Sequence, residues 1–282
     1  MTAGSALPGT DDATAGAAPN RTRRFRVGHI PGFGSIAIAF FVFLYAPIGV
    51  LVLFSFNAGP SATVWQGFGL DWYAKALANQ DIQRAAINSL IVATTATAVA
   101  TTLSTLAALG LVRGGRFRGA GAAYGLVVLP LMVPEIVTAV ATLTFFTAIG
   151  LSLGLINVII AHTVFCIPFA FLPIRARLQN MDHTIEQAAQ DLYADNWRTL
   201  RYITLPRLMP GILSGAMLAF IISLDDVIIT LMVAPPGATT LPLHVYGMVR
   251  MGITPEVNAI STLILALSIF MVSLSWLIGR RG

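Results

Sequence analysis

The sequence predicts an all-α membrane protein with six transmembrane helices, and three observations lead to this class. Of its 282 residues, 56% are hydrophobic and 10% are charged, whereas a soluble domain carries about 25% charged residues. Six apolar segments are long enough to cross about 30 Å of hydrocarbon, which takes about 20 helical residues. Most basic residues lie in the polar segments on one side of these spans. The single cysteine, Cys166, lies in an apolar segment and is expected to be a small buried hydrophobe.

The first 30 residues are rich in Ala, Gly, Thr and Asp and end in an arginine cluster. This composition indicates a disordered tail followed by a basic segment next to the membrane. The apolar run that follows is too long for the core of a signal peptide, so an uncleaved first span is expected. The expected organisation is a tail at 1–30, a first span with its outer loop at 31–84, and a transmembrane core at 85–282.

The expected spans determine the orientation of the chain. They lie near 34–56, 86–112, 121–149, 153–174, 210–233 and 258–278. An even number of spans puts both termini on one side, and the positive-inside rule assigns the arginine-rich side to the cytoplasm. The arginines on that side are Arg21, Arg23, Arg24, Arg26, Arg113, Arg116, Arg118, Arg175, Arg177, Arg198, Arg201, Arg207, Arg280 and Arg281. The formal net charge of +5 thus reflects membrane topology and does not indicate nucleic-acid binding.

A long polar loop at 175–209 is expected on the cytoplasmic side. It contains most of a largely helical stretch at 187–211, QAAQDLYADNWRTLRYITLPRLMPG, with Leu192, Tyr193 and Trp197 among its apolar points. We expect a helix near 187–200. A helix of this kind either docks a partner protein or lies flat on the membrane surface. The residues alone leave both interpretations open.

Three acidic residues fall inside the expected spans: Glu135, Asp225 and Asp226. A carboxylate at bilayer depth costs about 2.5–3.5 kcal/mol on insertion scales, so such residues usually face a bundle interior or a water-filled path. Because Pro130 and Pro134 cannot donate backbone hydrogen bonds, the third span is expected to be broken or kinked there. Glu135 is therefore a candidate for a substrate path. Alternatively, it caps a half-helix or lies nearer the outer surface.

Asp225 and Asp226 are adjacent, so their side chains point about 100° apart on a helix. At most one of them can face a narrow pore, and the other is expected to pair with a neighbouring helix or to stay protonated. Together with Glu135 they would form an acidic patch that favours a cationic substrate.

Three further residues are weaker candidates. Tyr246 could stack on an ammonium group at the outer mouth, or it could be an interfacial residue. Glu256 is expected to begin the sixth span rather than to bind a ligand. His162 in the fourth span is expected to be an interhelical hydrogen-bond partner rather than a ligand.

The stretch at 187–211 resembles the cytoplasmic coupling loop, or EAA loop, of the membrane subunits of bacterial ATP-binding-cassette importers. The positions that match the family pattern are Ala188, Ala189, Ile203, Leu205 and Pro206. Two positions depart from it. Gln187 stands where the family has Glu, with Glu186 one residue earlier, and Tyr193 stands where the family has the Gly that a tight turn favours.

Other segments resemble the permease subunits of spermidine and putrescine importers. They are NSLIVA at 88–93, LPLMVPEI at 129–136, SLDD at 223–226 and GATTLPLHVYGMVRMGITPEVNAISTLIL at 237–265. The similarity covers about 85–280 and, more loosely, the first span with SFN at 55–57. It implies a multi-pass permease of the bacterial plasma membrane that moves polyamine into the cytoplasm. Another small solute, such as ferric iron or an amino-acid-like compound, is the alternative, and the intramembrane carboxylates argue against an anion.

The resemblance also implies roles and partners. The residues implied to couple to the ATPase are Gln187, Ala188, Ala189, Tyr193, Leu205 and Pro206. The implied partners are a second, homologous transmembrane subunit, two ATP-binding-cassette ATPase subunits and an external substrate-binding protein.

Motifs for catalysis and metal binding are absent from the sequence. It has no GxxxxGK[ST] phosphate loop. The chain is therefore not expected to hydrolyse ATP alone. The resemblance implies a transport subunit that is not an enzyme and holds no cofactor, with ATP and Mg bound by the partner ATPase. No CxxC or HExxH spacing occurs either. The alternative from another class is an ion-coupled secondary carrier with Glu135 and Asp225 as proton sites, or a membrane-embedded enzyme. A carrier would not need the long docking-like loop.

Overall fold

Three long helices form the centre of the structure: α3 (Gln80–Arg113), α6 (Leu155–Gln179) and α9 (Leu205–Asp225). The computed structural model describes residues 33–115, 117–151, 154–252 and 254–279. The expected tail at 1–30 lies outside the described residues, as do Arg116, Arg280 and Arg281. The chain divides into two compact units between Gly49 and Val50. The other helices are α1 (Phe33–Ser55), α2 (Asp71–Ala78), α4 (Ala120–Met132), α5 (Glu135–Ala148), α7 (Thr184–Asp191), α8 (Asn196–Thr199), α10 (Ile228–Val233), α11 (Leu241–Met251) and α12 (Pro255–Gly279).

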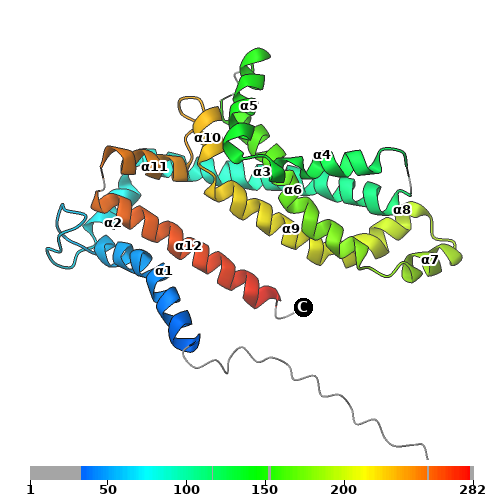
Figure 1. Ribbon diagram of the computed structural model, residues 1–282, viewed down its shortest axis with the longest axis horizontal. Coiled ribbons are helices and arrows are strands. Elements are labelled where there is room, and N and C mark those ends of the chain that lie inside the picture. Colours follow the sequence, from blue (N-terminus) through cyan, green and yellow to red (C-terminus); the bar gives the residue numbers. More distant parts are fainter. Residues whose placement is uncertain (1–32, 116, 152–153, 253, 280–282) are drawn as a thin grey trace, which may run out of the picture. The chain divides into compact units, whose positions relative to one another are not determined.

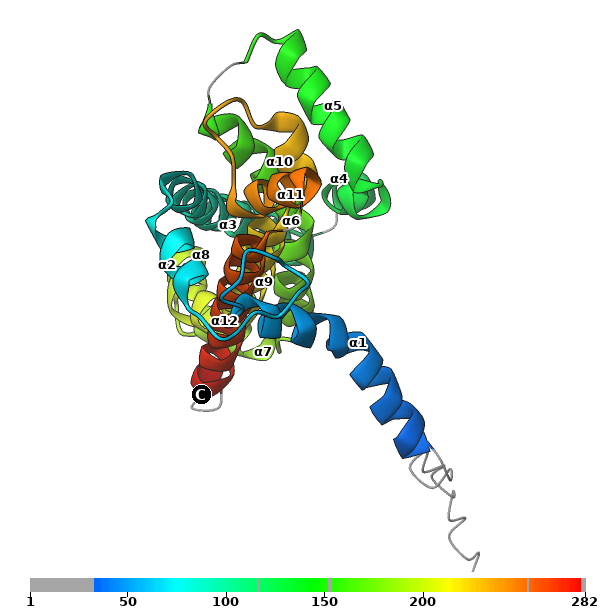
Figure 2. The ribbon, with the colours of Figure 1, turned by 90° about the vertical axis from the view of Figure 1, so that its left-hand side faces the viewer.

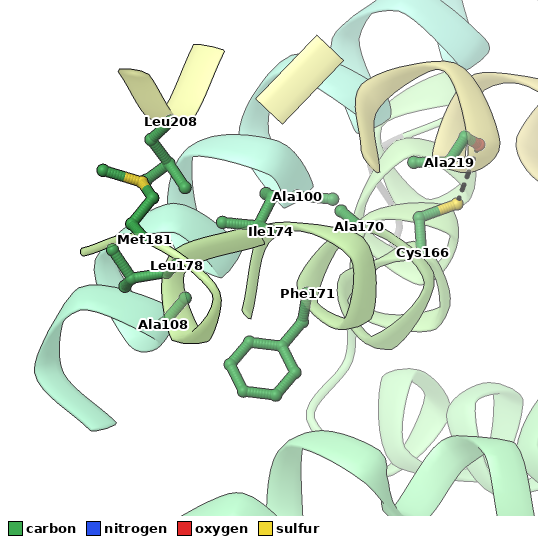
Figure 3. Close-up of a cluster of buried hydrophobic side chains, with 10 residues drawn as sticks. All are labelled: Ala100, Ala108, Cys166, Ala170, Phe171, Ile174, Leu178, Met181, Leu208 and Ala219. Atoms are coloured by element: carbon green, nitrogen blue, oxygen red, sulfur yellow. Dashed lines mark hydrogen bonds between the residues drawn. The ribbon is translucent and has the colours of Figure 1, made fainter. Parts of the chain in front are cut away.

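Small residues let α9 approach α6 closely. Gly211, Gly215 and Ala219 recur every four residues along α9 and are all buried. A Cβ atom added at Gly215 would lie 2.5 Å from the carbonyl oxygen of Ala170 in α6. Cys166 of α6 donates through Sγ to the carbonyl oxygen of Ala219 at 3.4 Å (Figure 3). Small residues with this spacing bring membrane helices into backbone contact, where dispersion forces are strongest.

The main apolar cluster lies where α3, α6 and α9 run side by side (Figures 1 and 3). Its larger side chains are Phe171, Ile174, Leu178 and Leu208, each fully buried. Phe171 also contacts the ring of Tyr124 on α4, with centroids 6.0 Å apart. Cys166 belongs to this cluster and is fully buried, so its expected role as a small buried hydrophobe is confirmed.

Among the described residues, four helical segments are long and apolar enough to cross a membrane: Gly34–Ser55, Gln80–Arg113, Leu155–Gln179 and Asn196–Asp225. The helices α4 and α5 would form a fifth span if counted together, and they meet at an angle of 109° (Figure 2). The expected break in the third span is therefore confirmed. It falls at Val133–Pro134, while Pro130 lies within α4. In α12, the stretch Pro255–Ile269 is a shorter apolar segment below that length, so the expected sixth span stays a prediction.

The prediction of one continuous span at 210–233 was wrong. The helix begins earlier, at Leu205, ends at Asp225, and is followed after a two-residue break by the short helix α10. The break occurs because Asp226 adopts an extended backbone conformation and its carboxylate accepts hydrogen bonds from the amides of Ile229 and Thr230. The side chain thus replaces the helical acceptors that the first turn of α10 lacks.

The prediction of a single helix near 187–200 was also wrong. Helix α7 ends at Asp191, and α8 begins only at Asn196. The amide of Ala194 donates to the carbonyl oxygen of Ala189 at 3.0 Å, and the amide of Tyr193 donates to that of Gln190 at 2.9 Å. These two bonds define a Schellman cap, whose C′ residue takes the left-handed conformation usually supplied by Gly. Tyr193 occupies this position with φ 62°.

A π-helical turn, η2 (Leu200–Thr204), joins α8 to α9. Such turns are rare and frequently lie at functional sites. Because of this turn, the chain runs from α8 into α9 without a break, and Leu205 and Pro206 form the first turn of α9.

Side-chain amides and hydroxyls order the loop after α1 and hold the segment before α11 against α3. The Asn57 carboxamide donates to the carbonyl oxygens of Ser61 and Val64 and accepts from the amide of Gln66, which orders the loop after α1. At the start of α3, the Asn88 carboxamide donates to the carbonyl oxygens of Gly237 and Thr239. The Ser89 hydroxyl accepts from the amide of Leu241, which begins α11.

The close contact of α9 with α6 predicts the effect of a single methyl group. Gly215→Ala should lower the free energy of unfolding by about 1–3 kcal/mol, because the added Cβ would collide with backbone that cannot rotate away. The matched control is Gly110→Ala in α3, where an added Cβ meets nothing within 4 Å. Thermal unfolding in detergent measures both variants. Equal melting temperatures for the two would contradict the close packing.

The cap of α7 predicts that a substitution to Gly stabilises the protein. Tyr193→Gly should raise the free energy of unfolding by about 1 kcal/mol, since an L-residue pays about 1–2 kcal/mol in the left-handed region. The side chain of Tyr193 is 94% exposed, so little packing is lost. Tyr202→Gly is the control, because this exposed tyrosine has helical backbone and its change should destabilise. A lower melting temperature for Tyr193→Gly would refute the strain.

Candidate coupling site and substrate path

The coupling residues predicted from sequence lie on two neighbouring pieces of the chain. Gln187 and Ala188 are exposed on α7, and Ala189 is the buried residue of that helix. Leu205 and Pro206 begin α9. The turn after α7 and the start of α8 present Leu192, Tyr193 and Trp197 to the outside, all strongly exposed. The loop therefore offers an exposed helix and a large apolar tip, which suits docking of a partner protein.

Glu186 joins the two pieces. One carboxylate oxygen, Oε1, accepts a hydrogen bond from the Thr204 hydroxyl at 2.9 Å. The other, Oε2, lies 3.1 Å from Nε of Arg113, the last residue of α3. His183 completes the cluster: its Nδ1 lies 3.6 Å from the same oxygen and its Nε2 contacts Arg113 Nη1. Sequence reasoning noted Glu186 only as a shifted glutamate, and missed Arg113 and Thr204.

The segment before α7 is ordered by a second carboxylate. The amide of Thr184 donates to Oδ1 of Asp182 at 2.9 Å. This hydrogen bond stabilises the ionised form and holds the pKa of Asp182 below its usual value. Between this segment and the end of α3 lies a pocket of about 610 Å³, with Arg113, Glu186, Gln190 and Thr199 among its lining residues. Its walls come from α3, α7, α8 and η2, the elements that Glu186 and its neighbours connect.

The three intramembrane carboxylates differ in environment. Glu135 is the first residue of α5 and is partly buried; its carboxyl group interacts with that of Asp226. As a carboxylate in a first turn, Glu135 complements the helix dipole, and its role in a substrate path stays a prediction. Asp225, the last residue of α9, is exposed. The Asp226 side chain, in contrast, is only 2% exposed.

Asp226 belongs to a buried polar network with His162. His162 Nε2 lies 3.2 Å from Asp226 Oδ2 and 2.9 Å from the hydroxyl oxygen of Thr230. His162 Nδ1 pairs with the hydroxyl of Ser223 at 2.8 Å. The network joins α6, α9 and α10, so the expected role of His162 as an interhelical partner is confirmed. The expectation that one of the two aspartates pairs with a neighbouring helix is also confirmed, and the paired residue is Asp226.

The two candidates at the predicted outer mouth have partners within the chain. The guanidinium of Arg250 lies 5.8 Å from the ring centroid of Tyr246 on α11. A ring that faces a cation of its own chain is a weaker partner for an ammonium on that face. Glu256 lies in the first turn of α12 and accepts a hydrogen bond from Asn79, which supports its expected role as a helix-start residue.

The sequence-predicted residues therefore fall into separate groups. The bond from Thr204 to Glu186 links α7, which carries the QAA residues, to the π-helical turn that leads into α9. It places Glu135 beside Asp226 and leaves Asp225 exposed at the end of α9. Within the described part of the chain, no group of three or more His, Cys, Asp or Glu residues is placed to hold a metal ion.

Sequence comparison identifies relatives of this chain. A family model described as "Binding-protein-dependent transport system inner membrane component" matches residues 100–280. The putrescine transport system permease protein PotI of Escherichia coli (strain K12) is 40% identical over 248 residues, which cover 86% of this chain and 88% of the relative. The spermidine/putrescine transport system permease protein PotC of Haemophilus influenzae is 40% identical over 242 residues, covering 86% and 94%.

Solved structures share the fold at lower identity. A chain of a bacterial ABC transporter for import of the acidic polysaccharide alginate superposes with a TM-score of 0.66 at 15% identity, covering 88% of this chain and 94% of that one. A chain of the MetNI methionine ABC transporter gives a TM-score of 0.55 at 19% identity, covering 71% and 91%. With the family match and the 40% identical relatives, the chain belongs to the family of binding-protein-dependent transport system inner membrane components, which are multi-pass membrane permeases and not enzymes.

Proposed function

We propose that this chain is one of two transmembrane subunits of an ATP-driven importer that moves polyamine, spermidine or putrescine, into the cytoplasm. The observation that carries the proposal is the 40% identity, over nearly the whole of both chains, to permeases named for putrescine and spermidine. Membership of this family argues against the two alternatives from other classes, an ion-coupled secondary carrier and a membrane-embedded enzyme.

The proposed topology has six spans with both termini in the cytoplasm. Helices α4 and α5 make the third span together, and α12 makes the sixth. Arginines support the orientation: Arg113 ends α3, Arg177 lies in the last turn of α6, and Arg207 lies in the first turn of α9. Nε of Arg177 donates to the carbonyl oxygen of Arg207 at 3.3 Å, so these ends meet on one side. The positive-inside rule makes that side cytoplasmic.

The proposed complex contains a second, homologous membrane subunit, two ATP-binding-cassette ATPase subunits and an external substrate-binding protein. ATP and Mg bind the ATPases, and this chain carries no cofactor. The exposed face of α7, with Gln187 and Ala188, and the apolar tip around Tyr193 dock on an ATPase. Closure of the ATPases moves α7, and the membrane helices follow as rigid bodies that open the path alternately to each side.

Two carboxylates are the proposed contacts for the cation along the path. Asp225 is exposed at the end of α9, and Glu135 begins α5 at the break in the third span. Ammonium groups of a polyamine would replace water on these carboxylates as they pass. Asp226 instead maintains the break between α9 and α10, because its oxygens are held by His162, Ile229 and Thr230. Tyr246, which is exposed, is a secondary contact at the outer mouth.

ATP-dependent uptake of labelled spermidine tests the proposed function. Vesicles would contain this chain, its companion subunit, the ATPase and the external binding protein, with putrescine, ferric ion, sulfate and amino acids as competitors. Uptake that only polyamines inhibit is the expected result. An active complex that imports a different solute would reject the polyamine assignment and retain the importer.

The difference between the two aspartates gives a paired prediction. Asp225→Asn should lower polyamine uptake while the assembled complex stays stable, because this side chain is exposed. Asp226→Asn should lower the melting temperature and the yield of complex, because it weakens the buried pair with His162 and the cap of α10. Uptake kinetics and thermal unfolding separate the effects. Unchanged uptake in Asp225→Asn would remove Asp225 from the path.

A further inference from the structure

Helix α7 is attached to the membrane helices with little apolar packing. Ala189 is its buried residue, while Gln187, Ala188, Gln190 and Asp191 are exposed. A helix of eight residues that buries so little apolar surface has no large hydrophobic contribution to fix its position. Its orientation must then depend on specific polar contacts.

The Glu186 carboxylate provides such contacts to two membrane helices at once. It lies 3.1 Å from Nε of Arg113 at the end of α3, and it accepts from the hydroxyl of Thr204 at 2.9 Å. The side chains of Glu186 and Arg113 are 13% and 14% exposed, so solvent screens the pair only weakly. Arg113 Nε has no hydrogen-bond partner, so this contact is an ion pair set by charge and distance, and the hydrogen bond from Thr204 is the directional contact of Glu186.

The partners of Glu186 belong to the parts of the fold that carry motion into the membrane. Arg113 ends α3, and Thr204 is the last residue of the π-helical turn before α9. Both α3 and α9 pack along α6 and along each other (Figure 1). A displacement of α7 therefore reaches two of the three central helices through one carboxylate.

We propose that Glu186 is the positioning residue that fixes α7 to the ends of α3 and α9, so that movement of the docked ATPase displaces both helices together. This inference rests on the proposed importer function. In this chain Glu186, rather than the neighbouring Gln187 at the position of the family's Glu, connects the coupling helix to the membrane helices. Gln187 is exposed, and its side chain is available to the partner.

Glu186→Gln tests the proposal, because it keeps the shape of the side chain and removes its charge. ATP-driven uptake by the full complex should fall about fivefold or more, a coupling loss of the usual allosteric size. Assembly and ATP hydrolysis should stay within about twofold of wild type, since the exposed docking face is unchanged. Asp81→Asn is the control: it removes the same charge from an exposed position in the first turn of α3, at the opposite end of that helix from Arg113, and should leave both activities unchanged.

Charge reversal distinguishes the pair from either residue alone. Arg113→Glu and Glu186→Arg should each uncouple uptake from hydrolysis, and the double variant should recover part of the lost uptake. No recovery in a double variant that assembles normally would overturn the role of the pair. Loss of ATPase binding in Glu186→Gln would make Glu186 a docking residue instead, and would also overturn the proposal.

A distance measurement is independent of the transported solute. Spin labels at Gln190 on α7 and Leu106 on α3, both exposed, would report the position of α7 in the complex in nanodiscs. Glu186→Gln should broaden the distance distribution, and Asp81→Asn should not. An unchanged distribution would refute the proposal even if polyamine is transported. A broadened one would uphold the positioning role even if the solute proved to be different.

Discussion

The backbone contact between α6 and α9 is the constraint on which the rest of the structure depends. Helix α9 has small residues at its contact with α6, so no large side chain keeps the two helices apart; these residues are Gly211, Gly215 and Ala219. Lipid tails are as apolar as leucine, so membrane helices gain little from hydrophobic burial and need close packing instead. This packing sets α3, α6 and α9 side by side. It thereby brings the end of α3 and the start of α9 within reach of one carboxylate on α7.

The second requirement is that polar groups inside the bundle have partners. Ending a helix at Asp225 leaves backbone groups open at a depth where an unsatisfied group costs several kcal/mol. The structure meets this requirement locally, because Asp226 accepts from two amides of α10 and pairs with His162. His162 uses both ring nitrogens, one toward Ser223 and one toward Asp226 and Thr230. The break is therefore stabilised by specific bonds, and it separates the buried carboxylate of Asp226 from the exposed carboxylate of Asp225.

Much of the fold could be predicted from residue patterns, and the failures have physical reasons. Apolar runs predicted most of the long helices, and prolines predicted the break before Glu135, since both are local properties of the chain. The break at Asp226 was missed because an aspartate that caps a helix and an aspartate that lines a path look alike without knowledge of His162. Glu186 was undervalued because its partner Arg113 is 73 residues away. The small-residue spacing in α9 was a readable signal that went unused.

Tyr193 shows what the turn after α7 requires. The two cap bonds from Tyr193 and Ala194 form with a tyrosine at the left-handed position, at a φ of 62°. The position specifies a dihedral angle, and glycine is the residue that adopts it with least strain. A sequence search for coupling loops that requires Gly at this position would therefore miss chains like this one. A search for a helix of two turns closed by a left-handed residue, before a proline-led membrane helix, would find it.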